Sequence, residues 1–383
     1  MGPIQNEASH IEIRQIPVSA SHDGLGADKL SLRRQRAPMN LPPLPAQPHG
    51  TPWPTIDWPL GELPKALDHA AFQAQMDQGF TAFEETHAVV IIQGGRLIYE
   101  RYGPDHGPDI TCMSWSKAKS ITHGLAGILV GDGKLDIHAP ADVPEWKTLG
   151  DPRGAITPDQ LLRMSSGLEF AEVYEPDKPS DTIAMMWGIG KDDVAHYAAD
   201  KPLVGAPDGI WSYSSGTTNI VARILAKTLN AYGTDFEAFM RERLFEPLGM
   251  KSPVPKFDTA GTFIGSSFCF ATARDFARFG LLYLRDGKWE GRQLLPEYWA
   301  DYARIPTWQQ PGVTDGRYGA HWWLDIAGPG TFSANGHEGQ FTVIVPELDM
   351  VMVRHGKTNT TLSPLIKPWI AGVVDLFRTG AGR

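Results

Sequence analysis

The β-strand signals of this chain lie near its two ends, and a long helical stretch separates them. Residues 87–102 read as two β-branched runs around the turn Gly94-Gly95, which predicts a hairpin. Further strands are predicted at residues 319–326, 330–335, 340–345 and 350–354. Strands at both ends with helices between them predict one α/β unit made from the two ends of the chain, with a helical unit inserted in its middle.

The prolines set the first boundary. Nine of the 27 residues from 38 to 64 are proline, which forbids a helix and predicts an extended N-terminal arm over residues 1–64. Apolar residues at helical spacing predict a helix over residues 65–85, and a second such pattern predicts a closing helix over residues 364–377. We therefore expect an α/β domain from residues 65–112 and 265–383, and a helical domain from residues 113–264.

Charge and composition exclude several classes of partner. The 35 Lys and Arg residues against 44 Asp and Glu residues give 35 − 44 = −9, so no basic field favours nucleic acid or an anionic membrane. No apolar run approaches the length of a membrane helix, and the pair Arg33-Arg34 is not followed by the apolar segment of an export signal. These features predict a cytoplasmic protein.

The two cysteines, Cys112 and Cys269, are too few and too far apart in sequence for a disulfide framework or a Cys-based zinc site. We expect both to be reduced, small and half-buried. No metal or other cofactor is expected.

The signatures of α/β-hydrolases, P-loop proteins, Rossmann folds and zincins are absent from the sequence. The pattern S-x-x-K occurs twice in overlap, as Ser114/Lys117 and as Ser116/Lys119, at the start of a predicted helix. Residues three apart lie on one face of a helix, so the lysine amine can reach the serine hydroxyl. A lysine acts as a base only when its pKa is depressed by burial or by neighbouring cations. A helix cap followed by a solvated lysine is the alternative reading.

Two later segments add to this pattern: Trp211-Ser212-Tyr213-Ser214-Ser215-Gly216 before a predicted helix, and Gly336-His337-Glu338-Gly339-Gln340 at the head of a predicted strand. The order S-x-x-K, Y-x-S, H-x-G resembles the serine β-lactamase-like superfamily, which includes class C β-lactamases, DD-peptidases, family VIII esterases and 6-aminohexanoate-dimer hydrolases. The resemblance spans about residues 85–380. It includes the segments at residues 156–168, 247–250, 271–280 and 345–349.

The resemblance also selects between the two overlapping pairs. In the family the nucleophilic serine is usually the first residue of the motif S-x-x-K-S-[IF]-T. The glycine that ends a D-x-G turn usually follows this serine by 17 residues. Ser116 is followed by Lys119-Ser120-Ile121-Thr122, and the turn glycine is Gly133, with 133 − 116 = 17. Ser114 would need two extra residues, so the resemblance favours Ser116 and Lys119.

The resemblance implies an antiparallel sheet with the N- and C-terminal helices on one face, an all-helical domain against the other, and the site between them. It also implies that Ser116 attacks an ester or amide carbonyl while Lys119 and Tyr213 transfer the proton. The backbone N–H groups of Ser116 and Gln340 would form the oxyanion hole.

Departures from the β-lactamase pattern bear on the substrate. The chain has His337-Glu338-Gly339 where the family's β-lactamases have Lys-Thr-Gly, which exchanges a permanent cation for a mostly neutral imidazole. Ser215 stands where those enzymes carry an asparagine. With these changes we expect an ester or small amide as substrate, and weak or no β-lactam hydrolysis.

Other residues near the motifs are candidates for the lining of the pocket or for contact with the substrate. Tyr174 and Trp187 line the pocket or serve packing, and His337 and Gly339 are expected to contact the substrate. Ser266 and Ser267 are read as loop residues, and the acidic run of residues 172–181 as a solvated loop.

Three alternatives stay open at the level of the sequence. The first is a non-catalytic binding module of the same fold, and the second is an acyltransferase that uses the same residues. The third is β-lactamase or DD-peptidase activity. The oligomeric state is also open, with a homodimer among the options.

Overall fold

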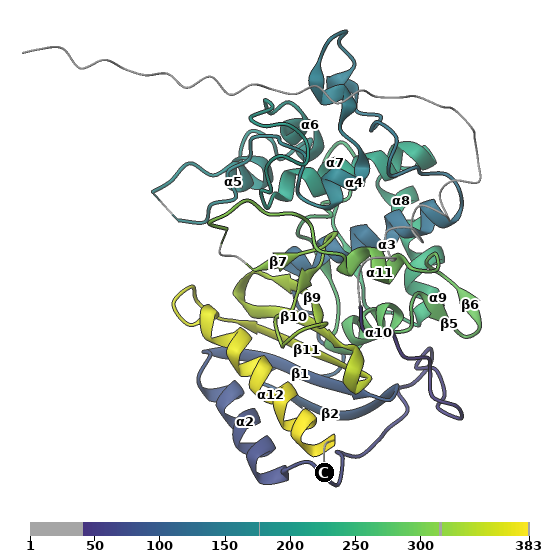
Figure 1. Cartoon of the computed structure of the whole chain (residues 1–383), viewed down its shortest axis with the longest axis vertical. Coiled ribbons are helices and arrows are strands. Elements are labelled where there is room, and N and C mark those ends of the chain that lie inside the picture. Colours follow the sequence, from purple (N-terminus) through teal and green to yellow (C-terminus); the bar gives the residue numbers. More distant parts are fainter. Residues whose placement is uncertain (1–40, 176, 314–315, 382–383) are drawn as a thin grey trace, which may run out of the picture.

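The computed structural model describes residues 41–175, 177–313 and 316–381. Its centre is an antiparallel sheet of seven strands in the order β2-β1-β11-β10-β9-β8-β7 (Figure 1). The N-terminal hairpin, β1 (Glu85–Gln93) and β2 (Arg96–Tyr102), pairs with the last strand, β11 (Met350–Lys357). The prediction of one sheet built from both ends of the chain is confirmed.

The remaining strands of this sheet are β7 (Arg317–Tyr318), β8 (Trp323–Leu324), β9 (Phe332–Gly336) and β10 (Gln340–Val345). Two small pairs lie outside it: β3 (Val254–Pro255) with β4 (Cys269–Phe270), and β5 (Lys288–Trp289) with β6 (Arg292–Gln293). The α-helices are α2 (His69–Thr81), α3 (Ala118–Gly131), α4 (Pro158–Leu162), α5 (Asp181–Trp187), α6 (Val194–Ala199), α7 (Ser215–Leu229), α8 (Thr234–Met240), α9 (Glu246–Leu248), α10 (Ala273–Leu284), α11 (Trp299–Arg304) and α12 (Ile366–Ala381).

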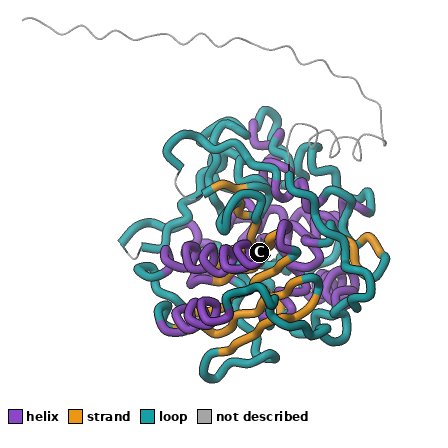
Figure 2. The backbone as a smooth tube through the Cα atoms, turned by 60° about the horizontal axis from the view of Figure 1, so that its bottom comes forward, coloured by secondary structure: helices purple, strands orange, loops and turns teal. Residues whose placement is uncertain are grey.

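Both faces of the sheet are covered, which explains the unbroken apolar run in β1. Val89 and Ile91 belong to the core formed with α2 and α12, which lie side by side on one face (Figure 2). Val90 and Ile92 point the other way, into the larger core shared with α10 and the helical part. Strands buried on both faces lose the alternation of polar and apolar residues, because neither side meets water.

Two secondary-structure predictions were wrong. Residues 319–326 do not form one strand but the turn and second strand of the short hairpin β7–β8, in which the Gly319 N–H donates to the Trp322 carbonyl and His321 has a φ of 55°. The middle of the chain also contains the strand pair β3–β4, which the sequence analysis did not predict. Both errors concern two-residue strands, which are too short for an alternating pattern to show.

The proline-rich arm wraps over the surface in its described part, residues 41–64. Trp58 is buried, and the Arg278 guanidinium of α10 donates to the Pro54 carbonyl at 2.7 Å. The Trp289 indole donates to the Thr55 hydroxyl at 2.8 Å. The arm is therefore held by the α/β part through both polar and apolar contacts. The rest of the predicted arm, residues 1–40, lies outside the described residues.

The arm passes close to Gly249, which permits a first test. Gly249 has a φ of 72°, and a Cβ placed on it would lie 1.8 Å from the Thr55 carbonyl oxygen. Gly249→Ala should therefore cost the strain of a left-handed residue, about 1 kcal/mol, plus about 1–3 kcal/mol for the overlap with the arm. Thermal unfolding measures this loss.

Gly291 is the matched control, because its φ is 75° and no atom lies within 4 Å of its added Cβ. Gly291→Ala should lose only the strain. Equal destabilisation by the two substitutions would contradict the docking of the arm against Gly249.

Candidate active site

Ser116 lies in a short 3-10 helix, Trp115–Lys117, that leads directly into α3. Trp115 has a φ of 45°, a left-handed conformation that is strained for a bulky residue. Its indole donates to the Glu338 carboxylate at 2.9 Å, which ties this turn to the segment before β10. This hydrogen bond helps to fix the turn that carries Ser116.

Lys119, one turn further along, contacts Ser116 directly. Its Nζ lies 3.0 Å from the Ser116 Oγ, 3.0 Å from the Ser215 Oγ and 3.0 Å from the Ser266 carbonyl oxygen. The side chain is 1% exposed. Burial lowers the pKa of Lys119 to about 8, and the negative charge of Glu172 opposes that shift. At pH 7 roughly one lysine in ten is then neutral and able to accept a proton.

The overlapping pair has different partners. The Ser114 Oγ donates to the Ser267 carbonyl at 2.9 Å and accepts from the Cys269 N–H at 2.9 Å. Lys117 points to the opposite side, where its Nζ lies 2.8 Å from the His355 Nε2. The structure therefore brings the Ser116 hydroxyl and the Lys119 amine together, whereas the Ser114 hydroxyl and the Lys117 amine bond to different partners.

Tyr213 and Ser215 approach Lys119 from the start of α7. The Tyr213 ring centroid lies 4.8 Å from the Lys119 Nζ, and the ring packs beside Trp323 at 5.4 Å. Ser214 caps α7 by accepting from the Thr217 N–H, which fixes the loop that carries both neighbours of the lysine. The predicted trio Ser116, Lys119 and Tyr213 thus converges at one place.

Glu172 was missed by the sequence analysis, which read residues 172–181 as a solvated loop. Its carboxylate accepts from the Ser215 N–H and the Ser215 hydroxyl, each at 2.7 Å, and from the Tyr174 hydroxyl at 2.5 Å. At the other end of the run, Asp181 pairs with Lys201 and accepts from Tyr197. The solvated-loop reading is wrong at both ends, because each carboxylate finds partners on distant segments.

Ser266 and Ser267 do lie in a turn, but both are buried, and their carbonyls hold Lys119 and Ser114. Their contribution comes from backbone carbonyls, which residue type does not reveal.

A cavity of about 810 Å³ lies next to Tyr213 and Glu172, which are part of its lining; Ser116 and Lys119 are not among the lining residues. The lining combines aromatic side chains with charged groups of both signs, and includes Tyr174, Trp211, Trp323, His337 and Lys367. The His337 ring stacks on Tyr174 with centroids 5.1 Å apart.

Three other residues that the sequence analysis assigned to the site, Trp187, Gly339 and Gln340, do not line this cavity. Trp187 is 52% exposed, packs against Phe268 and is not part of the lining. Gly339 faces the interior, where a Cβ would lie 2.2 Å from an Arg354 nitrogen. The Gln340 side chain bonds to the backbone of Gly356 in β11, and Gln340 is not among the residues that line the cavity.

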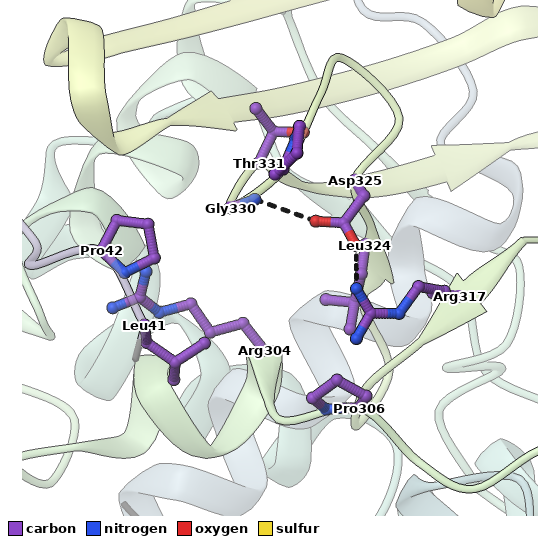
Figure 3. Close-up of a pocket in the computed structure, with 10 residues that line it drawn as sticks. Leu41, Pro42, Arg304, Pro306, Arg317, Leu324, Asp325, Gly330 and Thr331 are labelled. Carbon is purple, nitrogen blue, oxygen red and sulfur yellow. Dashed lines mark hydrogen bonds and ion pairs between the residues drawn. The ribbon is translucent and has the colours of Figure 1, made fainter. Parts of the chain in front are cut away.

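A second hollow, of about 370 Å³, lies between the arm and the β8–β9 turn (Figure 3). Its lining includes Leu41, Pro42 and the Arg317–Asp325 ion pair. Among its lining residues there is no lysine beside a hydroxyl, so it lacks the chemistry found around Ser116.

The family model "Beta-lactamase" matches residues 76–365 of this chain. The chain belongs to the Beta-lactamase family. A 6-aminohexanoate-dimer hydrolase of Paenarthrobacter ureafaciens is 24% identical over 285 residues, which cover 70% of this chain and 72% of that protein.

Solved structures show the same fold. A Bacillus anthracis protein assigned as a 6-aminohexanoate-dimer hydrolase superposes with a TM-score of 0.67 at 22% identity, covering 78% of this chain and 82% of that one. A penicillin-binding protein homologue from Caulobacter crescentus gives a TM-score of 0.64 at 19% identity, covering 82% and 99%. The antiparallel sheet with flanking helices that the resemblance implied is confirmed. Within the described part of this family member, no helix combines the length and apolarity needed to cross a bilayer.

The environment of Lys119 predicts a pH dependence. If Lys119 is the base, kcat/KM should rise with pH through a midpoint near 8, as its amine loses the proton. Glu172 raises the pKa of Lys119, so Glu172→Gln should move the midpoint to lower pH, even if it also lowers the maximal rate. A pH–rate profile of both proteins measures the shift.

Glu175→Gln is the control, since Glu175 belongs to the same loop but pairs with Lys178 at the surface. A midpoint that stays fixed or rises in Glu172→Gln would contradict the assignment of that titration to Lys119.

Proposed function

We propose that the protein is a serine hydrolase that cleaves a carboxylic ester or small amide through an acyl-enzyme on Ser116. The observation that carries the proposal is the state of Lys119. All three of its hydrogen-bond partners among the described residues are uncharged hydroxyl or carbonyl groups. A buried ammonium without a carboxylate partner is costly, so its neutral form is favoured, and one of its partners is the candidate nucleophile.

The proposed reaction begins when the Ser116 Oγ attacks the carbonyl carbon of the substrate and its proton passes to the Lys119 Nζ. Collapse of the tetrahedral intermediate breaks the bond to the leaving alcohol or amine, and Tyr213 passes the proton to that group. A water molecule then attacks the acyl carbon, gives its proton back through the same pair, and releases the acid from Ser116.

The negative oxygen of the intermediate needs hydrogen-bond donors close to Ser116. We assign this role to the backbone N–H groups of Ser116 and Gln340. The 3-10 helix that carries Ser116 packs directly on β9 and β10, and Gly336 of β9 permits the close approach: a Cβ there would lie 2.4 Å from the Ser114 carbonyl oxygen. Loss of one such donor costs about 3–4 kcal/mol of transition-state stabilisation in other hydrolases.

The cavity supports a small, partly apolar substrate. Tyr174, Trp211 and Trp323 offer flat apolar surface. His337 is not a permanent cation where the β-lactamase pattern has a lysine, although Lys367 lies elsewhere in the lining. The name of the Paenarthrobacter relative points to a linear amide, so we include the 6-aminohexanoate dimer with short-chain esters as test substrates. Weak or absent β-lactam hydrolysis is part of the proposal.

The direct test compares the two serines. Ser116→Ala should abolish hydrolysis of a short-chain p-nitrophenyl ester, whereas Ser114→Ala should keep most of it and lose only about 1–2 kcal/mol of stability through its two missing hydrogen bonds. Labelling by a fluorophosphonate probe, followed by peptide mass mapping, should mark Ser116 alone. A label on Ser114, or equal rates for Ser116→Ala and the unaltered protein, would overturn the proposal.

The role of His337 gives a test of specificity. His337→Lys places a full charge at the cavity wall and should improve the ratio of β-lactam to neutral-ester hydrolysis by about 5- to 30-fold, equivalent to about 1–2 kcal/mol. The selectivity ratio is the measurement. A parallel fall of both activities would instead make His337 a general base.

A further inference from the structure

Three side chains of types that can bind metal lie together outside the cavity described above, at the end of the β1–β2 hairpin that is opposite its turn. His87, His106 and Cys112 each offer one ligand atom, and these atoms all lie within 4.8 Å of one another. They come from β1, from the loop after β2 and from the segment before the 3-10 helix, so the fold, rather than sequence spacing, brings them together. Cys112 is buried, and the two histidines are half-buried.

The hydrogen bonds of both histidines indicate which ring nitrogen carries the proton and which keeps its lone pair. The His106 Nδ1 lies 2.8 Å from the Pro104 carbonyl, so this nitrogen carries the proton and Nε2 keeps its lone pair. The His87 Nε2 lies 3.2 Å from the Glu85 carboxylate, which leaves the lone pair on Nδ1. A second bond to a carbonyl or carboxylate is the arrangement that orients metal-bound imidazoles in proteins.

The donor set also fits in size and charge. Zinc binds imidazole nitrogen at about 2.0–2.1 Å and thiolate sulfur at about 2.3 Å, so ligand atoms at the present separations need to close by only about 1 Å. The two imidazole rings now stack at 3.9 Å with 9° between their planes, so one ring must turn to aim its lone pair at the ion. His106 lies in a loop outside the helices and strands, and a turn of its ring would exchange the present hydrogen bond to the Pro104 carbonyl for a bond to the ion. Zn²⁺ binding would release the proton of the Cys112 thiol, and the resulting thiolate and the Glu85 carboxylate would together offset the two charges of the ion.

We propose that His87, His106 and Cys112 form a site for Zn²⁺, with solvent in the fourth position. The site is separate from the proposed hydrolysis and does not depend on it. Its consequence is structural: Cys112 pairs with Ala271 through two backbone hydrogen bonds and lies just before the turn that carries Ser116. A bound ion would tie this segment to β1 and stabilise the chain by mass action.

The experiment uses the full chain without an affinity tag, treated with a chelator and then titrated with Co²⁺, which reports on thiolate ligands by an intense charge-transfer band. We expect one equivalent of Co²⁺ to produce the band, Zn²⁺ to displace it, and Zn²⁺ to raise Tm in a concentration-dependent manner. Cys112→Ala should remove the band and the Tm shift. Its loss of affinity should exceed the roughly 10- to 100-fold caused by losing an outer-shell partner.

Cys269→Ala is the matched control, because Cys269 is the other buried cysteine and is not part of the cluster. It should keep both the band and the Tm shift. If Cys112→Ala does not fold, His106→Asn, at a half-buried position, takes its place as the test. It should weaken Co²⁺ binding. Absence of the band in the unaltered chain, or an unchanged band in Cys112→Ala, would overturn the proposal.

Discussion

The structure depends on the burial of the Lys119 ammonium without a carboxylate partner. An isolated charge in a protein interior is expensive, and proteins usually avoid the cost by pairing the charge or by shifting its pKa. Here Glu172 is the nearby acid, and it bonds to Ser215 and Tyr174 rather than to the lysine. The lysine is therefore held by neutral oxygens, and its pKa falls to about 8.

The neighbouring Lys117 shows that burial alone does not make a base for the proposed nucleophile. It is as deeply buried as Lys119, and burial also lowers its pKa, but its amine contacts His355 of β11 and lies against Phe276 of α10. The two lysines leave the same turn in different directions. Of the two amines, only that of Lys119 lies next to the hydroxyl of Ser116. We attribute this difference to the packing of the turn against β9 and β10.

Much of this arrangement could be predicted from the sequence, because it rests on long apolar segments or on motifs with specific chemistry. The β-branched hairpin and the strands of residues 340–345 and 350–354 are long, continuous apolar runs, and the closing helix has enough residues for its helical period to show. The S-x-x-K spacing places two side chains on one face of a helix, whatever surrounds them.

The rest could not be predicted because it depends on contacts between distant segments. Glu172 in an acidic run looks like any solvated carboxylate until the fold brings Ser215 to it. The contact of Lys119 with the Ser266 carbonyl uses a backbone atom that every residue has, so the sequence does not indicate it. The cluster of His87, His106 and Cys112 has no metal-site spacing, since a bulge in β1 between Thr86 and Ala88 and a separate loop position its histidines.

The central claim is that Lys119 loses its proton near neutral pH inside the folded protein. Heteronuclear NMR of lysine side chains, with the Lys119 signal assigned by its absence in Lys119→Arg, measures that titration directly. The account predicts a midpoint near 8. A midpoint at or above the ordinary lysine value of 10.5 would contradict it, because Lys119 would then remain an ammonium ion throughout the range in which Ser116 must be activated.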